Sequence, residues 1–442
     1  MTLRVERVRS HHAPPNADHH MVLTITSLAL LTIAFGLSTN ALAQAFVGGM
    51  VLVTTILLAG IWADESLAFV RWYIFTSCIV TLGCSALYIS LPRRIRIIHP
   101  SPGLFPSKIV PHLALASSLT SVSIAIFSSL GPDLSFGTWL ETTAALSSTP
   151  ALSLLLYVTF FVGAGLLLFS RKVGKWRNPM IFIAAAALLA VIAILRIKLL
   201  AVPVAIAMFF PVDTNTFSWK TLSTFAVIFV VGYFGVMFTR WLGDPSELTL
   251  EKAAETFQAV LSAGFERHMV SQSSAVFNYF GETGEFQFGA VYQRLALYPF
   301  DVLFGTSLAP ANPMYGYHEI WSQGPNLDRN SVHPTIYGDS FAEFGWLGIF
   351  VPGAMFFVIS ALGKRGASTL TACLLIPTTF TGIVMLVRGS TYYGWYYILL
   401  GCVLVTAYLI IQKGIDFAVF WTKRQRSYFA HADGIRTNSL QE

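Results

Sequence analysis

The chain has 442 residues, of which 55% are hydrophobic, 14% are aromatic and only 11% are charged. Soluble domains carry roughly 25% charged residues, so this chain has too little polar surface for a soluble globule and belongs to the membrane class. Its formal net charge of +6 does not indicate nucleic-acid binding, because the basic residues form short clusters between apolar runs. That pattern is typical of the cytoplasmic loops of membrane proteins.

The N-terminal segment 1–20 is polar and basic, and we expect it to be a disordered tail. The apolar stretch that follows begins at Met21 and holds no charge as far as Ala63. It is too long for the core of a cleaved signal peptide and predicts an uncleaved first membrane segment. The tail histidines resemble a metal-binding tract, and all four cysteines fall inside apolar runs, yet we predict neither a metal site nor a disulfide framework.

Uncharged runs long enough for a membrane-spanning helix of about 20 residues follow one another along the chain. They cover 21–63, 72–92, 109–130, 150–170, 179–195, 221–239, 344–363, 366–387 and 389–412. The first run has room for two spans, with a turn at Ser38-Thr39-Asn40. Leu199 to Pro211 is a shorter apolar segment that contains Pro203. The sequence therefore predicts an all-α polytopic membrane protein with 10 to 12 spans, and we expect 11.

Four basic clusters fix the expected orientation, because positive residues favour the cytoplasmic side. They lie at 93–96, 171–177, 364–365 and 423–426. Counting back from the C-terminal cluster places the long segment 241–343 outside and 212–220 inside. Helix 179–195 must then run outward, and 199–211 must return as a short or broken helix. This hairpin places Arg196 and Lys198 at its outer end, and the same counting places Arg240 and Arg388 at outer helix ends.

The N-terminal part leaves two alternatives. A cytoplasmic tail and a cytoplasmic 93–108 require an even number of spans between them, yet the sequence shows three. Either the tail is exported despite its arginines, or one segment does not span. The expected organisation is the tail 1–20, an N-terminal bundle 21–240, a large periplasmic loop 241–343, C-terminal helices 344–412 and a cytoplasmic tail 413–442.

The long loop holds 12 acidic residues and four basic ones. It opens with an amphipathic stretch from Ser246 to Leu261, which predicts a helix that lies on the membrane surface or covers the helix bundle. From Phe277 to Tyr337 the loop is rich in aromatic residues, Gly, Pro and Asn, and we expect irregular, ordered structure there. Such aromatic and amide side chains suit sugar binding, and they equally suit the aromatic belt at a membrane interface.

The segment Val332 to Gly348 resembles the end of the large periplasmic loop in O-antigen polymerases (Wzy-type) and the related O-antigen ligases. His333, Glu343, Gly345 and Gly348 follow the order of the family pattern, although His-Pro replaces the His-Asn pair of the ligases. Arg196 matches an arginine near a mid-chain hairpin, and Arg294 to Gly305 fits an Arg-x10-Gly pattern. The resemblance implies a GT-C-like bundle in the bacterial inner membrane, with its active site facing the periplasm.

The resemblance also implies a reaction, in which undecaprenyl-diphosphate-linked oligosaccharide repeat units are joined into a surface polysaccharide without cofactor or metal. Arginine suits the departing diphosphate, because its guanidinium pairs bidentately with phosphate oxygens. We expect Arg196 and Arg388 in that role, with Lys198 and Arg240 next. A general base must accept the proton of the attacking hydroxyl. His333 is the first candidate base, followed by Asp339 and Glu343, and we assign Tyr292, Arg294 and Tyr337 to glycan binding.

Each of these residues also has an ordinary structural explanation. Rim arginines and lysines can extend to the headgroups, a loop histidine is commonly exposed to solvent, and Glu343 can cap a helix. Two other functions stay open. An O-antigen ligase would transfer the glycan to lipid A-core, and a polysaccharide or lipid transporter would move it without chemistry. The expected partners are the lipid-linked oligosaccharide, membrane lipid and a chain-length regulator, with no nucleic acid.

Overall fold

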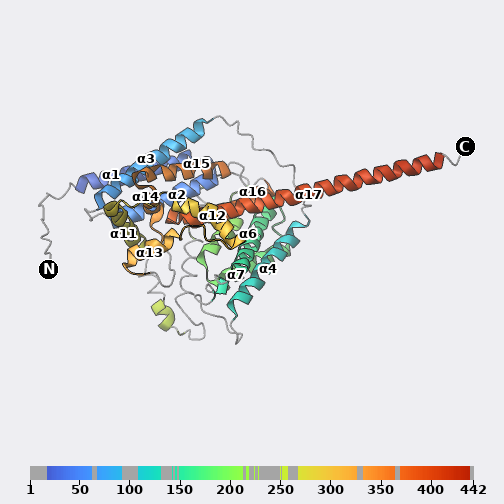
Figure 1. Cartoon of the computed structure of the whole chain (residues 1–442), viewed down its shortest axis with the longest axis horizontal. Helices are drawn as coiled ribbons and strands as arrows, with labels where there is room; N and C mark the ends of the chain where they lie inside the picture. Colours follow the sequence, from blue (N-terminus) through green and yellow to red (C-terminus); the bar gives the residue numbers. More distant parts are fainter. Residues whose placement is uncertain are drawn as a thin grey trace.

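The structure is a computed structural model. It describes isolated residues in 142–146, 223–227 and 249, and the ranges 17–61, 67–91, 108–130, 149–212, 216–218, 251–256, 267–325, 332–363 and 369–438. The regular elements within these ranges are all helices, as predicted. Two groups of helices lie on either side of a central pair, α16 and α17 (Figure 1). One group contains α1, α2, α3 and α15, and the other contains α4, α6, α7 and α8.

The first three helices are α1 (Ala17–Leu37), α2 (Ala41–Gly60) and α3 (Ala68–Ser90). The turn between α1 and α2 falls at 38–40, where the sequence predicted it. Asn40 stabilises this turn, since its side-chain oxygen accepts a hydrogen bond from the Ala43 amide at 2.9 Å and caps α2. Its side-chain nitrogen donates to the Ser360 carbonyl at 3.0 Å, so the turn packs against the end of α15 (Val351–Gly363).

The second group consists of α4 (Val110–Ser129), α6 (Pro150–Lys172), α7 (Pro179–Leu195), the short 3₁₀ helix η2 (Lys198–Leu200) and α8 (Ala201–Phe209). The predicted hairpin is confirmed, because α8 returns to the end of α6. The Arg171 guanidinium donates to the carbonyls of Ala207 and Phe210, each at 3.1 Å. Cations suit the C-terminal carbonyls of a helix, which have no partner within it.

Between residues 267 and 344 the described part of the long loop forms the helices α11 (Arg267–Thr283), α12 (Ala290–Phe304), α13 (Pro313–Ser322) and α14 (Thr335–Phe344). The prediction of irregular structure from Phe277 to Tyr337 was therefore wrong. The turn-forming residues lie at the ends of short helices, since Gly289 and Gly305 flank α12 and Asn312 caps α13. Of the predicted amphipathic helix at 246–261, residues 251–256 are helical and the remainder lies outside the described residues, apart from Thr249.

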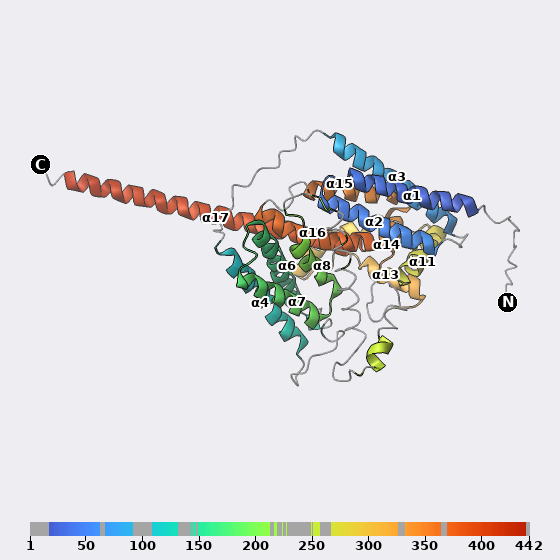
Figure 2. The same cartoon turned by 180° about the vertical axis from the view of Figure 1, so that it is seen from behind.

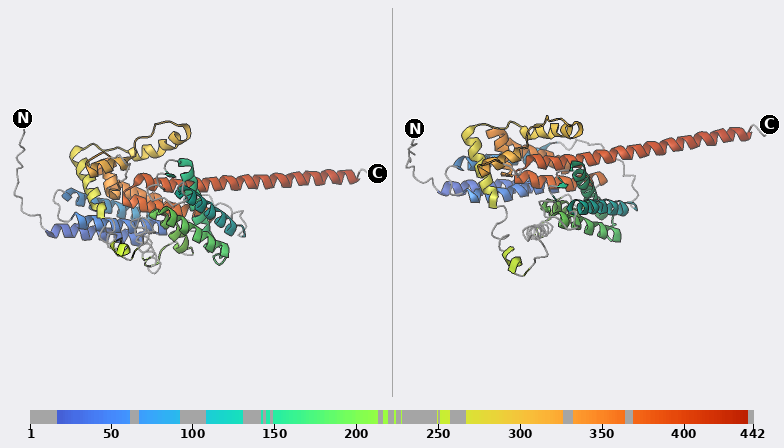
Figure 3. Two further views of the ribbon diagram at one scale, coloured as in Figure 1. Left: turned by 90° about the horizontal axis from the view of Figure 1, so that it is seen from below. Right: turned by 60° about the horizontal axis from the view of Figure 1, so that its bottom comes forward.

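The C-terminal part contains the 3₁₀ helix η4 (Gly345–Phe350), α15, α16 (Leu370–Arg388) and α17 (Thr391–Asn438). At 1.5 Å per residue, the 48 residues of α17 span about 72 Å. The helix is therefore far longer than the predicted span 389–412. It projects well beyond the bundle toward the C-terminus, as all the views of the whole chain show (Figures 1, 2 and 3).

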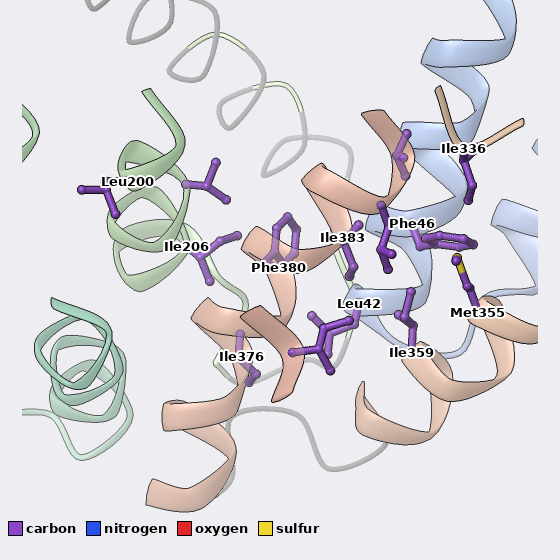
Figure 4. Packing of buried hydrophobic residues seen from close by; sticks show 14 of the residues in the cluster. Leu42, Phe46, Leu200, Ile206, Ile336, Met355, Ile359, Ile376, Phe380 and Ile383 are labelled. Carbon is purple, nitrogen blue, oxygen red and sulfur yellow. The ribbon is translucent and has the colours of Figure 1, made fainter. Parts of the chain in front are cut away.

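The core is centred on α16, which packs against α2, α6, α8 and α17. Figure 4 shows Phe380 and Ile383 of α16 among residues of α2, α8 and α15. The outer helices instead leave large apolar side chains exposed, and Phe127 of α4 is 74% exposed. An apolar surface outside a filled core is the pattern of a protein dissolved in lipid.

Seven helices of the described chain are long and apolar enough to cross a membrane, so the protein is a polytopic membrane protein. They are Ala41–Gly60, Ala68–Ser90, Val110–Ser129, Ala151–Lys172, Thr335–Gly363, Leu370–Arg388 and Thr391–Thr422. Met21–Leu37 and Pro179–Leu195 are shorter apolar helices. The predicted span at 221–239 lies outside the described residues, apart from Ser223 and Val227. The total of 10 to 12 spans stays a prediction.

The bundle has two distinct ends. At one end Arg171 binds the terminal carbonyls of α8, and the Phe217 amide donates to Gln44 at the start of α2, at 2.8 Å. We call this the basic end, since the clusters at 171–177 and 364–365 lie on or directly follow helices that finish there. Helices α11 to α14 gather at the opposite end, where Val270 of α11 packs against Gly60 of α2. We call this the loop end.

The direction of the first three helices bears on which side of the membrane the chain starts. Tyr73 near the start of α3 contacts Trp346, and Tyr88 near its end contacts Phe356, so α3 runs from the loop end to the basic end. Helix α1 also finishes at the basic end, beside Asn40. Because α1, α2 and α3 all run between the two ends, α1 starts at the loop end. The start of α1 and the end of α3 therefore lie at opposite ends of the bundle, the arrangement expected if the N-terminal tail is exported.

Two glycines of the 332–348 segment have clear packing roles. Gly345 ends α14 with a φ of 57°, a backbone conformation that favours glycine. A Cβ atom on Gly348 would collide with the carbonyl oxygen of Ser340 and the hydroxyl of Tyr73. The glycines therefore let the chain turn sharply out of α14 and press η4 back against it.

Replacing Gly348 with alanine should lower the thermal stability of the detergent-solubilised protein, because the added methyl group meets a backbone carbonyl. Overpacking of this kind costs about 1 to 3 kcal/mol. Gly83→Ala is the matched control, since an added Cβ there meets nothing within 4 Å, and it should leave the melting temperature unchanged or raise it. Size-exclusion chromatography after stepwise heating measures both. Equal transitions for the two variants would contradict the packing described for Gly348.

Candidate functional site

Asp339 and Glu343 lie four residues apart on α14 and are almost fully buried, with 0% and 1% of their surface exposed. This spacing places them on one face of the helix. The Oδ2 atom of Asp339 accepts a hydrogen bond from the amide of Thr391 at 2.8 Å. Thr391 is the first residue of α17, so the carboxylate caps that helix and satisfies one of its free amides.

The second oxygen of Asp339 connects α14 to α13 of the loop. Its Oδ1 atom accepts a hydrogen bond from the hydroxyl of Tyr317 in α13 at 2.9 Å. Burial first, and the nearby charge of Asp339 next, raise the pKa of Tyr317 well above its usual value, which keeps the phenol protonated as a donor. Both carboxylate oxygens are thus engaged, and Asp339 joins α13, α14 and α17.

Glu343 performs a similar task for α12. Its Oε1 atom accepts a hydrogen bond from the Val291 amide at 3.3 Å, in the first turn of α12. That turn begins at Gly289, which has no side chain to cap it. The Oε2 atom of Glu343 is buried and has no hydrogen-bond partner among the described residues. Of the two acids, Glu343 alone keeps a free oxygen.

The backbone next to Arg388 lies against the backbone close to His333. Arg388 is the last residue of α16, and Gly389 follows it with a φ of 93°. A Cβ atom on Gly389 would collide with the backbone of Thr335, two residues after His333. Only glycine fits this approach, which joins two predicted site residues that lie 55 positions apart in the sequence. Both side chains are half-buried at the loop end.

The other predicted diphosphate-binding residues are described in part. Arg196 ends α7 in a left-handed conformation with a φ of 53° and is half-buried. Leu199, three residues on, packs against the cluster of Phe161, Met385 and Tyr397. The corner that carries Arg196 therefore lies beside the last turn of α16 and the first turns of α17. Lys198 begins η2, but its side chain lies outside the described part of the chain, as does Arg240.

The three predicted glycan-binding residues differ in their surroundings. The guanidinium of Arg294 lies 4.8 Å from the ring centroid of Tyr298 and 5.2 Å from that of Tyr392. Tyr292 is half-buried against Phe344, and burial followed by the charges of Asp339 and Glu343 raises its pKa.

Tyr337 is fully buried, and its hydroxyl lies 2.7 Å from Thr54 Oγ1 inside the bundle. It therefore presents no surface to a sugar in this structure, because it faces α2 and not the loop end.

Sequence reasoning missed several residues that complete this region. Tyr317 holds Asp339, and Asn312 donates to the hydroxyl of Tyr393 at 3.2 Å. The ring of Tyr393 lies 6.5 Å from that of His333. A signal was present in the sequence, since residues 392–397 contain five aromatic side chains directly after Arg388. Within the described ranges no three His, Cys, Asp or Glu side chains converge to hold a metal ion.

Comparison of the chain with protein-family models, with curated proteins and with solved structures finds no match. The site is therefore defined by its own geometry. That geometry comprises a half-buried arginine and histidine at one junction, two buried acids that hold the surrounding helices, and an arginine between tyrosine rings.

Asp339→Ala should lower the melting temperature more than Tyr317→Phe. The alanine variant leaves the Thr391 amide without this acceptor, and an unpaired buried group costs about 1 to 3 kcal/mol. The Tyr317 hydroxyl loses its shorter hydrogen bond but can still donate to Gln287 Oε1, at 3.2 Å. Tyr317→Phe removes one of the two bonds together with its donor. Asp339→Asn should fall between wild type and Asp339→Ala, because an amide oxygen still accepts from Thr391. An Asp339→Ala variant as stable as wild type would refute the capping role.

Proposed function

We propose that the protein is a glycosyltransferase that joins lipid-diphosphate-linked oligosaccharide repeat units into a polysaccharide at the loop end of the bundle. The observation that supports this most directly is the contact of Gly389 with Thr335, which brings Arg388 and His333 to one junction. The reaction needs a cation for the leaving diphosphate and an acceptor for a hydroxyl proton. This junction offers both.

In the proposed reaction, a hydroxyl oxygen of the acceptor sugar forms a bond to the anomeric carbon of the donor. The bond between that carbon and the diphosphate oxygen breaks, and its electron pair leaves with the lipid diphosphate. Arg388 stabilises the charge that develops there, because a guanidinium never loses its proton at neutral pH and pairs bidentately with phosphate. Arg196 is the second candidate, since its corner lies beside the last turn of α16.

His333 takes the hydroxyl proton in this proposal, and Glu343 is the alternative base. His333 is half-buried, and the neutral form of an imidazole can accept a proton as a general base. Glu343 has a free buried oxygen, whereas both oxygens of Asp339 are occupied. We therefore assign Asp339 to positioning α17, which carries the tyrosines that follow Arg388.

The proposed location follows from charge and lipid contact. The basic cluster at 171–177, and the ends of α3 and α15 that the clusters at 93–96 and 364–365 follow in sequence, lie at the end opposite to α11–α14. The positive-inside rule therefore directs the loop end away from the cytoplasm. Lipid-linked substrates reach a site at the membrane surface by diffusing within the bilayer. We accordingly place the reaction on the periplasmic side of a bacterial inner membrane.

Purified protein supplied with a lipid-linked repeat unit in liposomes should form a ladder of products on a gel. Arg388→Ala and Arg196→Ala should each reduce this ladder by about 100-fold or more, the usual effect of removing charge stabilisation in a transition state. Arg177→Ala is the matched control, an exposed arginine at the basic end that should retain activity. Full activity in both Arg388→Ala and Arg196→Ala would refute the assignment of these arginines to the leaving diphosphate. A single transfer onto lipid A-core would indicate a ligase, and no consumption a transporter.

His333→Ala should slow formation of the ladder by about 100-fold or more, since general-base catalysis contributes roughly 10² to 10⁴. Glu343→Gln is the comparison, tested for both turnover and melting temperature. Normal turnover in His333→Ala combined with loss in Glu343→Gln would transfer the role of base to Glu343.

A further inference from the structure

Arg294, Tyr298, Tyr392 and Tyr393 form a group that we call the arginine–tyrosine cluster. The guanidinium of Arg294 lies over the rings of Tyr298 and Tyr392, whose centroids are 6.4 Å apart and whose planes meet at 86°. Two rings on one guanidinium restrict its motion and fix the direction of its N–H groups. The cluster joins α12 to the first turn of α17.

No carboxylate forms an ion pair with Arg294 in the described part of the chain, although the charge of Arg294 is the weakest of the causes that lower the pKa of Asp301. Its Nη1 atom donates to the carbonyl of Pro310, and its buried Nε atom has no hydrogen-bond partner. Asp301 lies on the same helix, but its carboxylate accepts from Thr306 Oγ1 at 2.7 Å and from the amides of Leu308 and Ala309. Asp301 therefore mainly stabilises its own loop. Arg294 is held by the Pro310 carbonyl and by the Tyr392 side chain, and it has no ion-pair partner there that would compete with an anionic ligand.

The cluster extends toward the proposed reaction centre. The rings of Tyr392 and Tyr393 are 5.2 Å apart, and the ring of Tyr393 lies 6.5 Å from His333. Asn312 holds the Tyr393 hydroxyl from α13. A chain of aromatic rings thus connects Arg294 with His333. A glycan whose reacting hydroxyl lies at His333 would place a neighbouring sugar along the half-buried rings of Tyr393 and Tyr298, with the buried ring of Tyr392 between them as support.

We infer that the arginine–tyrosine cluster is a subsite for an acidic sugar, one that carries a carboxylate. This inference rests on the proposed function, since it specifies the glycan that the same site receives. Tyrosine rings pack against the apolar C–H faces of sugars, and a guanidinium pairs bidentately with a carboxylate. A neutral sugar would use the rings alone, and a diphosphate would use the guanidinium alone. An acidic sugar uses both.

The composition of the loop strengthens the case for a specific cation. Segment 241–343 contains 12 acidic and four basic residues, so its general field repels an anionic glycan. An acidic sugar therefore needs a local positive group held in the right direction. Arg294 is the basic residue of this segment that the structure places between aromatic rings, next to the reaction centre.

Isothermal titration calorimetry on the full-length protein in nanodiscs tests the inference. The probes are digalacturonate and the neutral disaccharide galactobiose of the same linkage, with inorganic pyrophosphate as a third ligand. The wild type should bind digalacturonate about tenfold or more tightly than galactobiose, the gain expected of a charge-assisted bidentate pair. Arg294→Gln should abolish this preference, and Arg294→Lys should recover part of it. Lys252→Gln, a charge change elsewhere in the loop, should retain the preference.

Equal binding of the two disaccharides by the wild type would overturn the inference, as would a preference that survives in Arg294→Gln. Displacement of digalacturonate by pyrophosphate in an Arg294-dependent way would also overturn it, since the site would then bind diphosphate. Melting temperatures identify any variant that is simply unfolded. If Arg294→Gln is unfolded, the binding preference of Arg294→Lys provides the test instead. Binding requires no turnover. A preference for digalacturonate without any product ladder would therefore refute the proposed function and leave the acidic-sugar subsite supported.

Discussion

A buried carboxylate connects the helices of the loop end. Asp339 is inaccessible to solvent, and its two oxygens accept hydrogen bonds from Tyr317 in α13 and from the first amide of α17. Removing one partner of such a buried hydrogen bond costs about 1 to 3 kcal/mol, because the other group is left unsatisfied. The positions of α13 and α17 are therefore coupled, and the side chains that α17 presents after Arg388 depend on Asp339.

The second acid of α14 extends the same principle. Glu343 caps α12, whose own N-terminal residue is a glycine, and α12 carries Arg294. One short helix thus orients the two elements between which the arginine–tyrosine cluster forms. Gly348 and Gly389 allow this helix to pack closely on both sides, against η4 and against the end of α16. The proposed site depends on contacts between backbones as much as on its functional side chains.

The sequence predicted much of the bundle, because lipid imposes a simple requirement on each span. A helix that crosses the bilayer must be apolar over about 20 residues and satisfy its own backbone hydrogen bonds. For this reason the ends of α7, the turn before α2 and the return of α8 were all predicted near their observed positions. The loop was predicted poorly. Its helices are short, and glycine and asparagine at their ends have the same appearance as residues of an irregular segment.

By itself the sequence determined that the chain is a helical membrane protein, where most of its spans lie, and that Arg196 and Arg388 fall at the ends of helices. Those properties follow from local hydrophobicity and charge, which each segment carries independently. The tertiary structure decided which distant residues meet. It joined Arg388 to His333, placed Arg294 between Tyr298 and Tyr392, and turned Tyr337 into the bundle. Such contacts depend on packing between helices remote in sequence, and no local pattern specifies the pairing. The acids of α14 show the difference most clearly, since their spacing was visible but their partners were not.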